Sequence, residues 1–334
     1  MRYVFLIPDY LAGAIQRKLF RFAKSIPVFK GSLHRIATNQ NLRVVVAFGG
    51  TLNLMRHCQV AREQGADAVL ATVSGQNNYG SLGAIKLAPF IKWSERRPSD
   101  ICVLTDIYTR FIDSHQGPSI AYLQNPELIA RNFGYKRENV TLWTDSPFML
   151  ERCREAYPGK PIEIVPNVVD CHTFPFVRQS DREPGLLFAF PRKGPEFIAQ
   201  TMRRYQELGG RYWKLEKIDG LAIGELGKEF KRPQAFLASG DVEGCALPPQ
   251  ESMASGVVVV GKDARGANFS MRHRETAMIA NTPEDAAAAL RELEEEALRE
   301  KISMNAHRFI ERYFPENEPA ALWRTIIERH MTGG

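Results

Sequence analysis

Short apolar runs separated by helical spacing occupy the first half of this chain, and they constrain its fold more than any other feature. Each run has the near-continuous hydrophobic character of a strand that is buried on both faces. Helical spacing over Leu52–Gln64 and Phe148–Tyr157 separates some of them. Alternation of this kind predicts a parallel, doubly wound α/β sheet. The runs are Leu42–Phe48, Ala68–Val73, Ile101–Thr105, Ile120–Leu123, Thr141–Thr144 and Ile162–Val165.

The length of 334 residues predicts two domains. A polar stretch that ends in proline, Val177–Pro184, separates two apolar blocks and is interpreted as the linker. A further strand-like run, Leu186–Phe190, then opens a second α/β domain. We expect a basic extension or cap over residues 1–40, a first Rossmann-like domain over 41–178, a second over 179–310, and a last helix within 311–334.

The most distinctive motif is EGCALPPQESMASGVVVVG, over residues 243–261. Its prolines predict that a helix begins only at Gln250, and Gly256 predicts where that helix stops. A buried strand of valines follows. The carboxylate of Glu243 therefore lies in a loop and that of Glu251 in the first turn of a helix. Both are expected at the carboxyl edge of a sheet, facing the same crevice.

This motif resembles the E-x7-E motif of the retaining glycosyltransferases of family 4, which reads EGFGLPPLEAMACG. Residues 161–174 (PIEIVPNVVDCHTF) resemble a second phrase of the same family, with Val168 in place of its usual glycine. The resemblance covers about residues 42–310. It implies a compact GT-B architecture, in which a first, acceptor domain and a second, donor domain face a central cleft. It also implies that the last helix, within residues 311–334, packs back on the first domain.

The resemblance further implies transfer of a sugar from a nucleotide-diphosphate donor to an acceptor hydroxyl, with retention of anomeric configuration. It implies a part in assembling bacterial polysaccharide, lipopolysaccharide or glycolipid. The expected partners are a nucleotide sugar and a saccharide or lipid-linked acceptor. These residues do not identify the donor nucleotide, the sugar, the acceptor or the linkage.

The two acids of the motif have different expected roles. Glu251 is placed to accept hydrogen bonds from a ribose diol, or else to serve as an acid favoured by the positive end of a helix. Glu243 is placed to hold a sugar hydroxyl or to face the positive charge that develops at the anomeric carbon. Small side chains between the two acids let a ligand approach backbone N–H groups. These donor-binding candidates are Gly244, Cys245, Ala246 and Leu247.

Other candidates lie at the ends of predicted strands. Gly49 and Gly50 form a strand-to-helix turn where a backbone can approach a phosphate. Asp106 follows Ile101–Thr105 and either touches the sugar or acceptor or caps a helix. Arg192 and Lys193 follow the first strand of the second domain, where adjacent cations favour the leaving diphosphate. Weaker candidates in neighbouring loops are His115, Asn125, Asp145 and Gly266–Asn268.

Several site classes are disfavoured. No Asp-x-Asp motif ends a strand and no His/Asp cluster has ligand spacing, so we expect no metal and no cofactor. Five scattered cysteines predict reduced thiols and a cytoplasmic setting. The net charge of +6 favours anionic partners without choosing among them. Two alternatives stay open: a sugar-nucleotide epimerase on the same scaffold, and a basic nucleic-acid or membrane module without activity. If the chain is a glycosyltransferase, no nucleic-acid partner is expected.

Residues 1–40 carry an excess of cations with interleaved leucine, isoleucine and phenylalanine. This composition favours either a peripheral contact with an anionic membrane or a strand and helix that cap the first domain. The acidic residue among them is Asp9. The cations are Arg2, Arg17, Lys18, Arg21, Lys24, Lys30 and Arg35.

Overall fold

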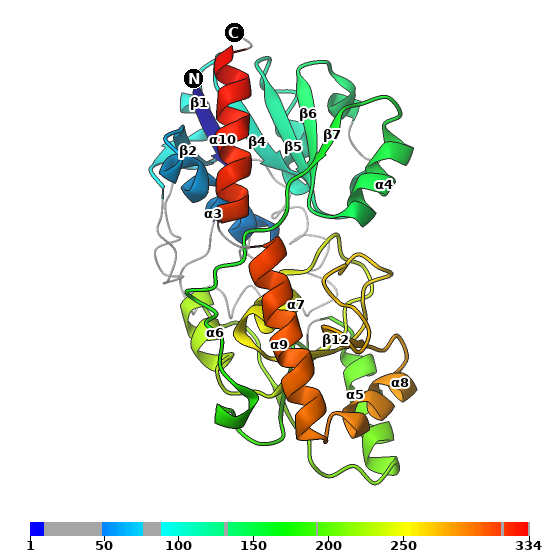
Figure 1. Cartoon of the computed structure of the whole chain (residues 1–334). Coiled ribbons are helices and arrows are strands. Elements are labelled where there is room, and N and C mark those ends of the chain that lie inside the picture. Colours follow the sequence, from blue (N-terminus) through cyan, green and yellow to red (C-terminus); the bar gives the residue numbers. More distant parts are fainter. Residues whose placement is uncertain (10–48, 76–87, 130–132, 192, 315–316, 333–334) are drawn as a thin grey trace.

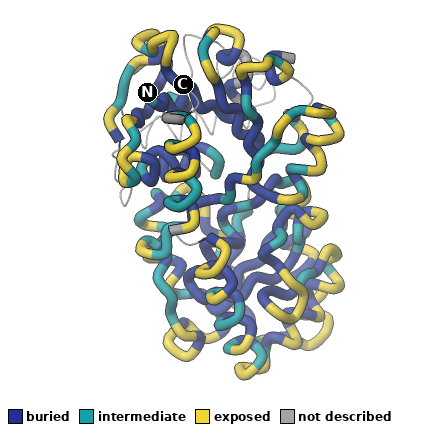
Figure 2. Tube along the Cα trace, turned by 45° about the horizontal axis from the view of Figure 1, so that its top comes forward, coloured by how far each residue is buried: buried dark blue, intermediate teal, exposed yellow. Residues whose placement is uncertain are grey.

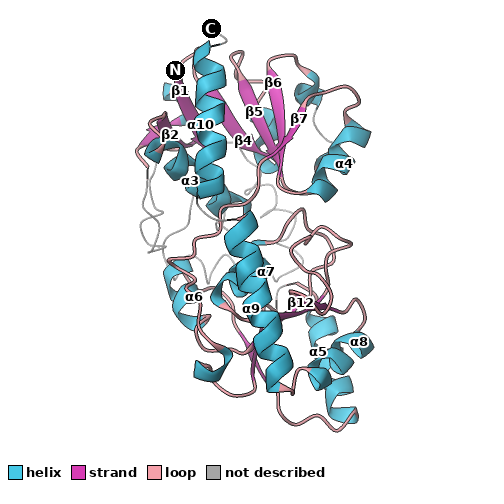
Figure 3. Cartoon of the chain, viewed as in Figure 1, coloured by secondary structure: helices cyan, strands magenta, loops and turns pink. Residues whose placement is uncertain are grey.

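A computed structural model of the chain describes residues 1–9, 49–75, 88–129, 133–191, 193–314 and 317–332. These residues form two α/β domains, one above the other in Figure 1, each built on its own parallel sheet (Figure 3). Buried residues fill the centre of each domain, and exposed residues gather on the outer loops and helices (Figure 2). The predicted strand Leu42–Phe48 lies outside the described residues.

The first sheet has seven parallel strands in the order β3-β2-β1-β4-β5-β6-β7. The apolar runs Ala68–Val73, Ile101–Thr105, Ile120–Leu123, Thr141–Thr144 and Ile162–Val165 are confirmed as strands within one residue at either end. Helices α3 (Gly50–Glu63) and α4 (Pro147–Ala156) lie between strands. The strands are β1 (Arg2–Leu6), β2 (Asp67–Thr72), β3 (Phe90–Lys92), β4 (Ile101–Thr105), β5 (Ser119–Leu123), β6 (Val140–Thr144) and β7 (Ile162–Ile164).

The prediction that residues 1–40 form an extension or cap is wrong for their first segment. Arg2–Leu6 is the strand β1, which pairs with β2 on one side and β4 on the other and so lies inside the sheet. Val4, Phe5 and Leu6 are fully buried there. Arg2 also pairs with Asp100 at 2.6 Å instead of facing a membrane. The remaining cations of the segment lie outside the described residues, and their contact with an anionic membrane stays a prediction.

The second sheet has five parallel strands in the order β12-β11-β10-β8-β9. Its first strand confirms the strand predicted at Leu186–Phe190. The strands are β8 (Leu186–Ala189), β9 (Lys214–Lys217), β10 (Ala235–Ala238), β11 (Val258–Gly261) and β12 (Ala277–Ile279). The helices are α5 (Pro195–Glu207), α6 (Ile223–Glu229), α7 (Leu247–Ser255), α8 (Pro283–Glu292) and α9 (Glu296–Tyr313).

Helix α7 begins earlier than the prolines predict. Leu247, Pro248 and Pro249 form its first turn, with Ala246 as the N-cap. Proline is compatible with this turn because the first N–H groups of a helix have no partner within it. Glu251 therefore lies in the second turn of α7, one turn later than expected. Gly256 ends the helix in the left-handed conformation, as predicted.

The stretch Val177–Pro184, predicted as the linker, is mostly exposed, but two of its side chains are anchored in the second domain. Gln179 is fully buried and donates to the main-chain oxygens of Gln234 and Gly256 at 3.1 and 2.7 Å. The Arg182 guanidinium is also buried and donates to the main chain at Phe230 and Pro233. The polar composition of the stretch predicted a linker, but the side chains of Gln179 and Arg182 donate to main-chain carbonyl groups of the second domain.

The C-terminal helix α10 (Asn317–Thr332) returns to the first domain, as expected from the resemblance (Figure 1). It lies against α3, and its Trp323 ring meets Tyr3 edge-on with centroids 5.3 Å apart. His330 Nδ1 lies 2.6 Å from the Tyr3 hydroxyl. The preceding helix α9 packs on α7 in the second domain. Among the described helices, none is long and apolar enough to cross a bilayer.

Candidate active site

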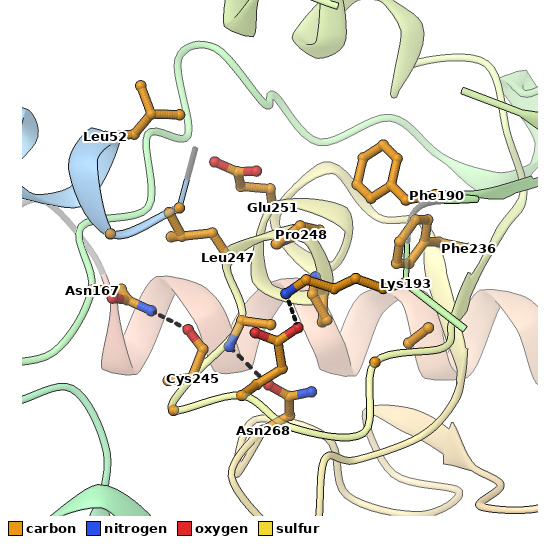
Figure 4. Close-up of a pocket in the computed structure, with 18 of the residues that line it drawn as sticks. Leu52, Asn167, Phe190, Lys193, Phe236, Cys245, Leu247, Pro248, Glu251 and Asn268 are labelled. Atoms are coloured by element: carbon orange, nitrogen blue, oxygen red, sulfur yellow. Dashed lines mark hydrogen bonds and ion pairs between the residues drawn. The ribbon is translucent and has the colours of Figure 1, made fainter. Parts of the chain in front are cut away.

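A cavity of about 360 Å³ lies between the two domains at the carboxyl ends of their strands (Figure 4). Order in the second sheet reverses between β8 and β10, and ligands of doubly wound sheets bind where strand order reverses. Lys193 follows β8 and Ser239 follows β10, and both line the cavity. Gln124 and Asp145, which follow β5 and β6, line it from the first domain. The predicted crevice is therefore present.

Glu243 and Lys193 form an ion pair in this cavity (Figure 4). Lys193 is half exposed, whereas 16% of the Glu243 side chain is accessible. The loop after β8 and the loop after β10 are thus joined by an ion pair at the cavity. Lys193 lies where the sequence predicted a diphosphate cation. Arg192, its predicted companion, lies outside the described residues.

Glu251 lines the cavity but is paired with an arginine of the other domain. Arg56, on α3, donates from Nη2 to Glu251 Oε1 at 2.9 Å and from Nη1 to the main-chain oxygen of Val168 at 2.9 Å. Both members of the pair are buried. Burial raises the pKa of Glu251, while the charge of Arg56 acts in the opposite direction. The carboxylate expected to hold a ribose therefore has a protein partner when no ligand is bound.

The small residues between the two acids contact both domains. Cys245 accepts at its main-chain oxygen from Asn167 at 3.0 Å, and the N–H of Ala246 donates to Asn268 Oδ1 at 2.9 Å (Figure 4). Gly244 and Leu247 line the cavity beside them. The amide of Ala246 is thus engaged by the protein, contrary to the expectation that it faces a ligand. Burial raises the pKa of the Cys245 thiol, which keeps it protonated.

The glycine turn lies where the sequence predicted it. Gly49 precedes α3 with φ of 50°, a left-handed value that glycine adopts without strain. Gly50 begins the helix, and a Cβ atom there would overlap Oε1 of Gln124. Both glycines line the cavity. The turn therefore leaves room both for Gln124 and for a ligand at the helix start.

Asp106 begins a short 3-10 helix, Asp106–Phe111, directly after β4. Its Oδ2 accepts from the main-chain N–H groups of Gln124 and Asn125 at 2.9 and 2.5 Å. The side chain is buried and does not line the cavity. Asp106 therefore holds the loop that carries Gln124, and the structure does not bring it to the cavity wall with the other candidates.

Sequence reasoning missed several cavity residues. Lys262 and Gln124 each follow a strand directly, and that position is the signal that could have identified them. Arg56 gave no such signal, because its partner Glu251 is 195 residues away. Phe190 and Phe236 belong to an apolar end of the cavity that also includes Leu221, Ile223 and Leu226. A planar, weakly polar group would fit that end.

Within the part of the chain that the structure describes, no three His, Cys, Asp or Glu side chains are grouped to hold a metal ion. Metal independence stays a prediction. Lys193 and Lys262 are the lysines of the cavity lining, and Lys262 Nζ pairs with Asp241 at 2.6 Å. Acids at the lining are Asp145, Asp219, Glu243 and Glu251.

Comparison of the sequence with family models gives no match. A curated relative, glycosyltransferase 1 domain-containing protein 1 of Xenopus tropicalis, is 25% identical over 138 residues. The match covers 40% of this chain and 39% of that protein. This chain therefore matches less than half the length of that relative.

Two solved structures match over all or nearly all of the chain. Sucrose-phosphate synthase from Thermosynechococcus elongatus has a TM-score of 0.69 at 11% identity, with full coverage of both chains. HepE of Anabaena, solved in complex with UDP-glucose, has a TM-score of 0.57 at 12% identity, covering 98% of this chain and 99% of that one. The fold of the chain is the GT-B fold of these glycosyltransferases, which confirms the expected architecture.

Proposed function

We propose that this protein is a retaining glycosyltransferase that transfers a sugar from a nucleotide-diphosphate donor to an acceptor hydroxyl. The observation that supports it is the cavity between the domains, which Glu243, Lys193 and Glu251 all line at the carboxyl edge of the second sheet. Of the two solved structures with the same fold, one is a sucrose-phosphate synthase, and the other, HepE, was solved in complex with UDP-glucose. UDP is therefore the first nucleotide to test.

The proposed chemistry follows from the charges of the cavity. Lys193 would exchange Glu243 for the diphosphate and stabilise the negative charge of the leaving group. Glu243, released from the lysine, would face the positive charge that develops at the anomeric carbon. The bond from that carbon to the phosphate oxygen breaks while the acceptor oxygen bonds on the same face. The departing phosphate oxygen takes the acceptor proton, so no separate base is required.

The apolar end of the cavity suits the nucleobase, and Glu251 suits the ribose diol. For Glu251 to bind a ribose, it must exchange Arg56 for two hydroxyl groups. The resemblance places the reaction in the assembly of bacterial polysaccharide, lipopolysaccharide or glycolipid, with a saccharide or lipid-linked acceptor. Metal ions and cofactors are not required in this mechanism.

A thermal-shift panel of UDP-, GDP-, ADP- and dTDP-sugars tests the donor, because a ligand that binds the folded state raises its stability by mass action. We expect one nucleotide class to raise the melting temperature and its sugar conjugate to release free nucleoside diphosphate when acceptor is present. Release should continue in excess EDTA. NMR of the product should show the anomeric configuration of the donor.

Each alternative outcome is distinct. An altered sugar still attached to its nucleotide would identify an epimerase. Loss of transfer in EDTA and its return with Mg²⁺ would contradict metal independence. Absence of any nucleotide effect, together with steeply salt-dependent binding to DNA or RNA, would favour a basic binding module.

A further inference from the structure

The first-domain wall of the cavity carries two buried polar atoms without a partner among the described residues. They are Oε1 of Gln124 and Oδ1 of Asp145. Asp145 is 1% exposed, and both residues line the cavity. A buried polar atom that forms no hydrogen bond costs about 1–3 kcal/mol. Two such atoms on one wall of a cavity indicate that a ligand supplies the missing bonds.

Both side chains are held in place by surrounding structure. Asp106 fixes the loop of Gln124 through its main-chain N–H groups. Gly50 and Gly244 flank the pair: a Cβ atom at Gly50 would overlap Gln124 Oε1, and one at Gly244 would come 3.1 Å from Asp145 Oδ1. Glycines from two different domains thus allow these two atoms to lie close to the main chain.

The charges around the pair favour an uncharged ligand group. Burial raises the pKa of Asp145 well above its usual range, and the negative charges of Asp106 and Glu243 raise it further, while hydrogen bonds from its own main chain and from Ser146 act in the opposite direction. A protonated carboxyl group donates one hydrogen bond, and the oxygen of Gln124 accepts one. A hydroxyl group both accepts and donates, so it satisfies the two atoms together. A phosphate or carboxylate would instead be repelled by Glu243 and Asp106.

We propose that Gln124 and Asp145 form a subsite for an uncharged hydroxyl group of the donor sugar. This inference rests on the proposed glycosyl transfer. Gly244, beside Asp145, adjoins Glu243, whose partner Lys193 is the cation assigned to the diphosphate. A sugar joined to that diphosphate therefore extends towards this wall. Gln124 and Asp145 then determine how tightly the sugar, rather than the nucleotide, is bound.

The test measures how much the sugar adds to nucleotide affinity. Calorimetry gives the dissociation constant of UDP divided by that of UDP-glucose. If another nucleotide sugar stabilises the wild type more in the thermal-shift panel, that nucleotide sugar and its nucleoside diphosphate are used in place of UDP-glucose and UDP. Asp145→Ala and Gln124→Ala should each lower this ratio about 10-fold, the worth of a hydrogen bond to a buried group. Binding of the free nucleoside diphosphate should change less than about two-fold.

Two further variants separate this role from a structural one. Asp145→Asn keeps a neutral donor of the same shape and should retain the ratio within about three-fold. Glu127→Ala changes an exposed acid in the same loop and should leave the ratio unchanged. Melting temperatures of all variants check that they fold. If Asp145→Ala does not fold, the ratios of Gln124→Ala and Asp145→Asn still test the subsite.

An unchanged ratio in Gln124→Ala and Asp145→Ala, with the nucleotide sugar bound, would overturn the subsite alone. The subsite would also be overturned if these variants slow transfer to the acceptor without slowing hydrolysis of the donor by water, because the two atoms would then bind the acceptor. Failure of every nucleotide sugar to bind the wild type would instead overturn the proposed function on which the subsite rests.

Discussion

The two walls of the cavity differ in how their polar groups are paired. On the second-domain wall, Glu251 is bonded to Arg56 and Glu243 to Lys193. On the first-domain wall, Gln124 and Asp145 each keep a buried atom without a partner among the described residues. A ligand must therefore displace existing bonds on one wall, whereas on the other it completes bonds that are missing. Substitutions on the two walls should have different consequences.

Arg56→Ala should have the largest effect. It removes one member of a buried ion pair that joins α3 to α7, and loss of one partner in such a pair typically costs about 3–5 kcal/mol. Thermal unfolding without ligand measures this loss. Arg204→Ala is the matched control, because Arg204 also pairs with two acids, Glu207 and Glu284, but is half exposed. A melting temperature as little changed in Arg56→Ala as in the control would show that the pair does not hold the domains together.

Glu251→Gln should weaken binding of the nucleoside diphosphate by about 1.5–3 kcal/mol, which is the worth of hydrogen bonds to a charged group. The amide keeps the shape of the carboxylate, so the change in affinity reports charge rather than packing. Calorimetry measures it, with Glu196→Gln, an exposed acid at the start of α5, as control. Equal affinity of wild type and Glu251→Gln would remove the ribose assignment.

The carboxyl group of Asp145 should make stability depend on pH. Its pKa is raised in the folded state, so its favourable contribution is complete below the unfolded value of about 3.9 and is lost as pH rises towards the folded value. Each unit of that rise is worth about 1.4 kcal/mol. Asp145→Asn does not titrate, so its stability relative to wild type should increase with pH above about 4.

Melting curves of the two proteins from pH 4 to pH 9 measure this difference. The charged groups that face Asp145 are Asp106 and Glu243, and both proteins retain them. The neighbouring Tyr122, Cys153 and Cys245 have raised pKa values and are also common to both. A difference in melting temperature that is constant over this range would mean that Asp145 is ionised throughout.

Lys193→Ala should have the smallest effect on stability. The ion pair with Glu243 is half exposed at the lysine, and such pairs contribute at most about 1 kcal/mol. Its effect should appear in turnover, because the leaving diphosphate loses a cation. Lys214→Ala, an exposed lysine on β9, is the control. A large fall in melting temperature with unchanged turnover would assign Lys193 to folding.

Much of the fold was predictable because each buried strand leaves its own local pattern. The predicted bounds of Ile101–Thr105 are those of β4, and the predicted bounds of α3 and α4 differ from the observed ones by at most two residues at each end. The segment of β1 was expected at most as a strand in a cap, since five apolar-rich residues before Pro8 do not reveal a central place in the sheet. Only its neighbours β2 and β4 give it a central position.

The candidate site was predictable where chemistry lies in one continuous motif. Glu243, Glu251 and Lys193 were named from residues 186–261 and do line the cavity. Asp106 was named from its position after a strand, and that position alone could not tell a cavity residue from one that holds a loop. Gln124 follows a strand in the same way and was not named. The direction in which a side chain points after a strand depends on its contacts with residues that are distant in the sequence.

The sequence by itself determined the parallel strands and the acids of the motif, because local spacing decides which residues are buried and where helices begin and end. The tertiary structure alone decided which groups are paired. Arg56 and Glu251 are 195 residues apart, and the glycines that flank Gln124 and Asp145 come from different domains. Hydrogen bonds and charges act over a few ångströms of space, and distance along the chain does not reveal which groups come that close.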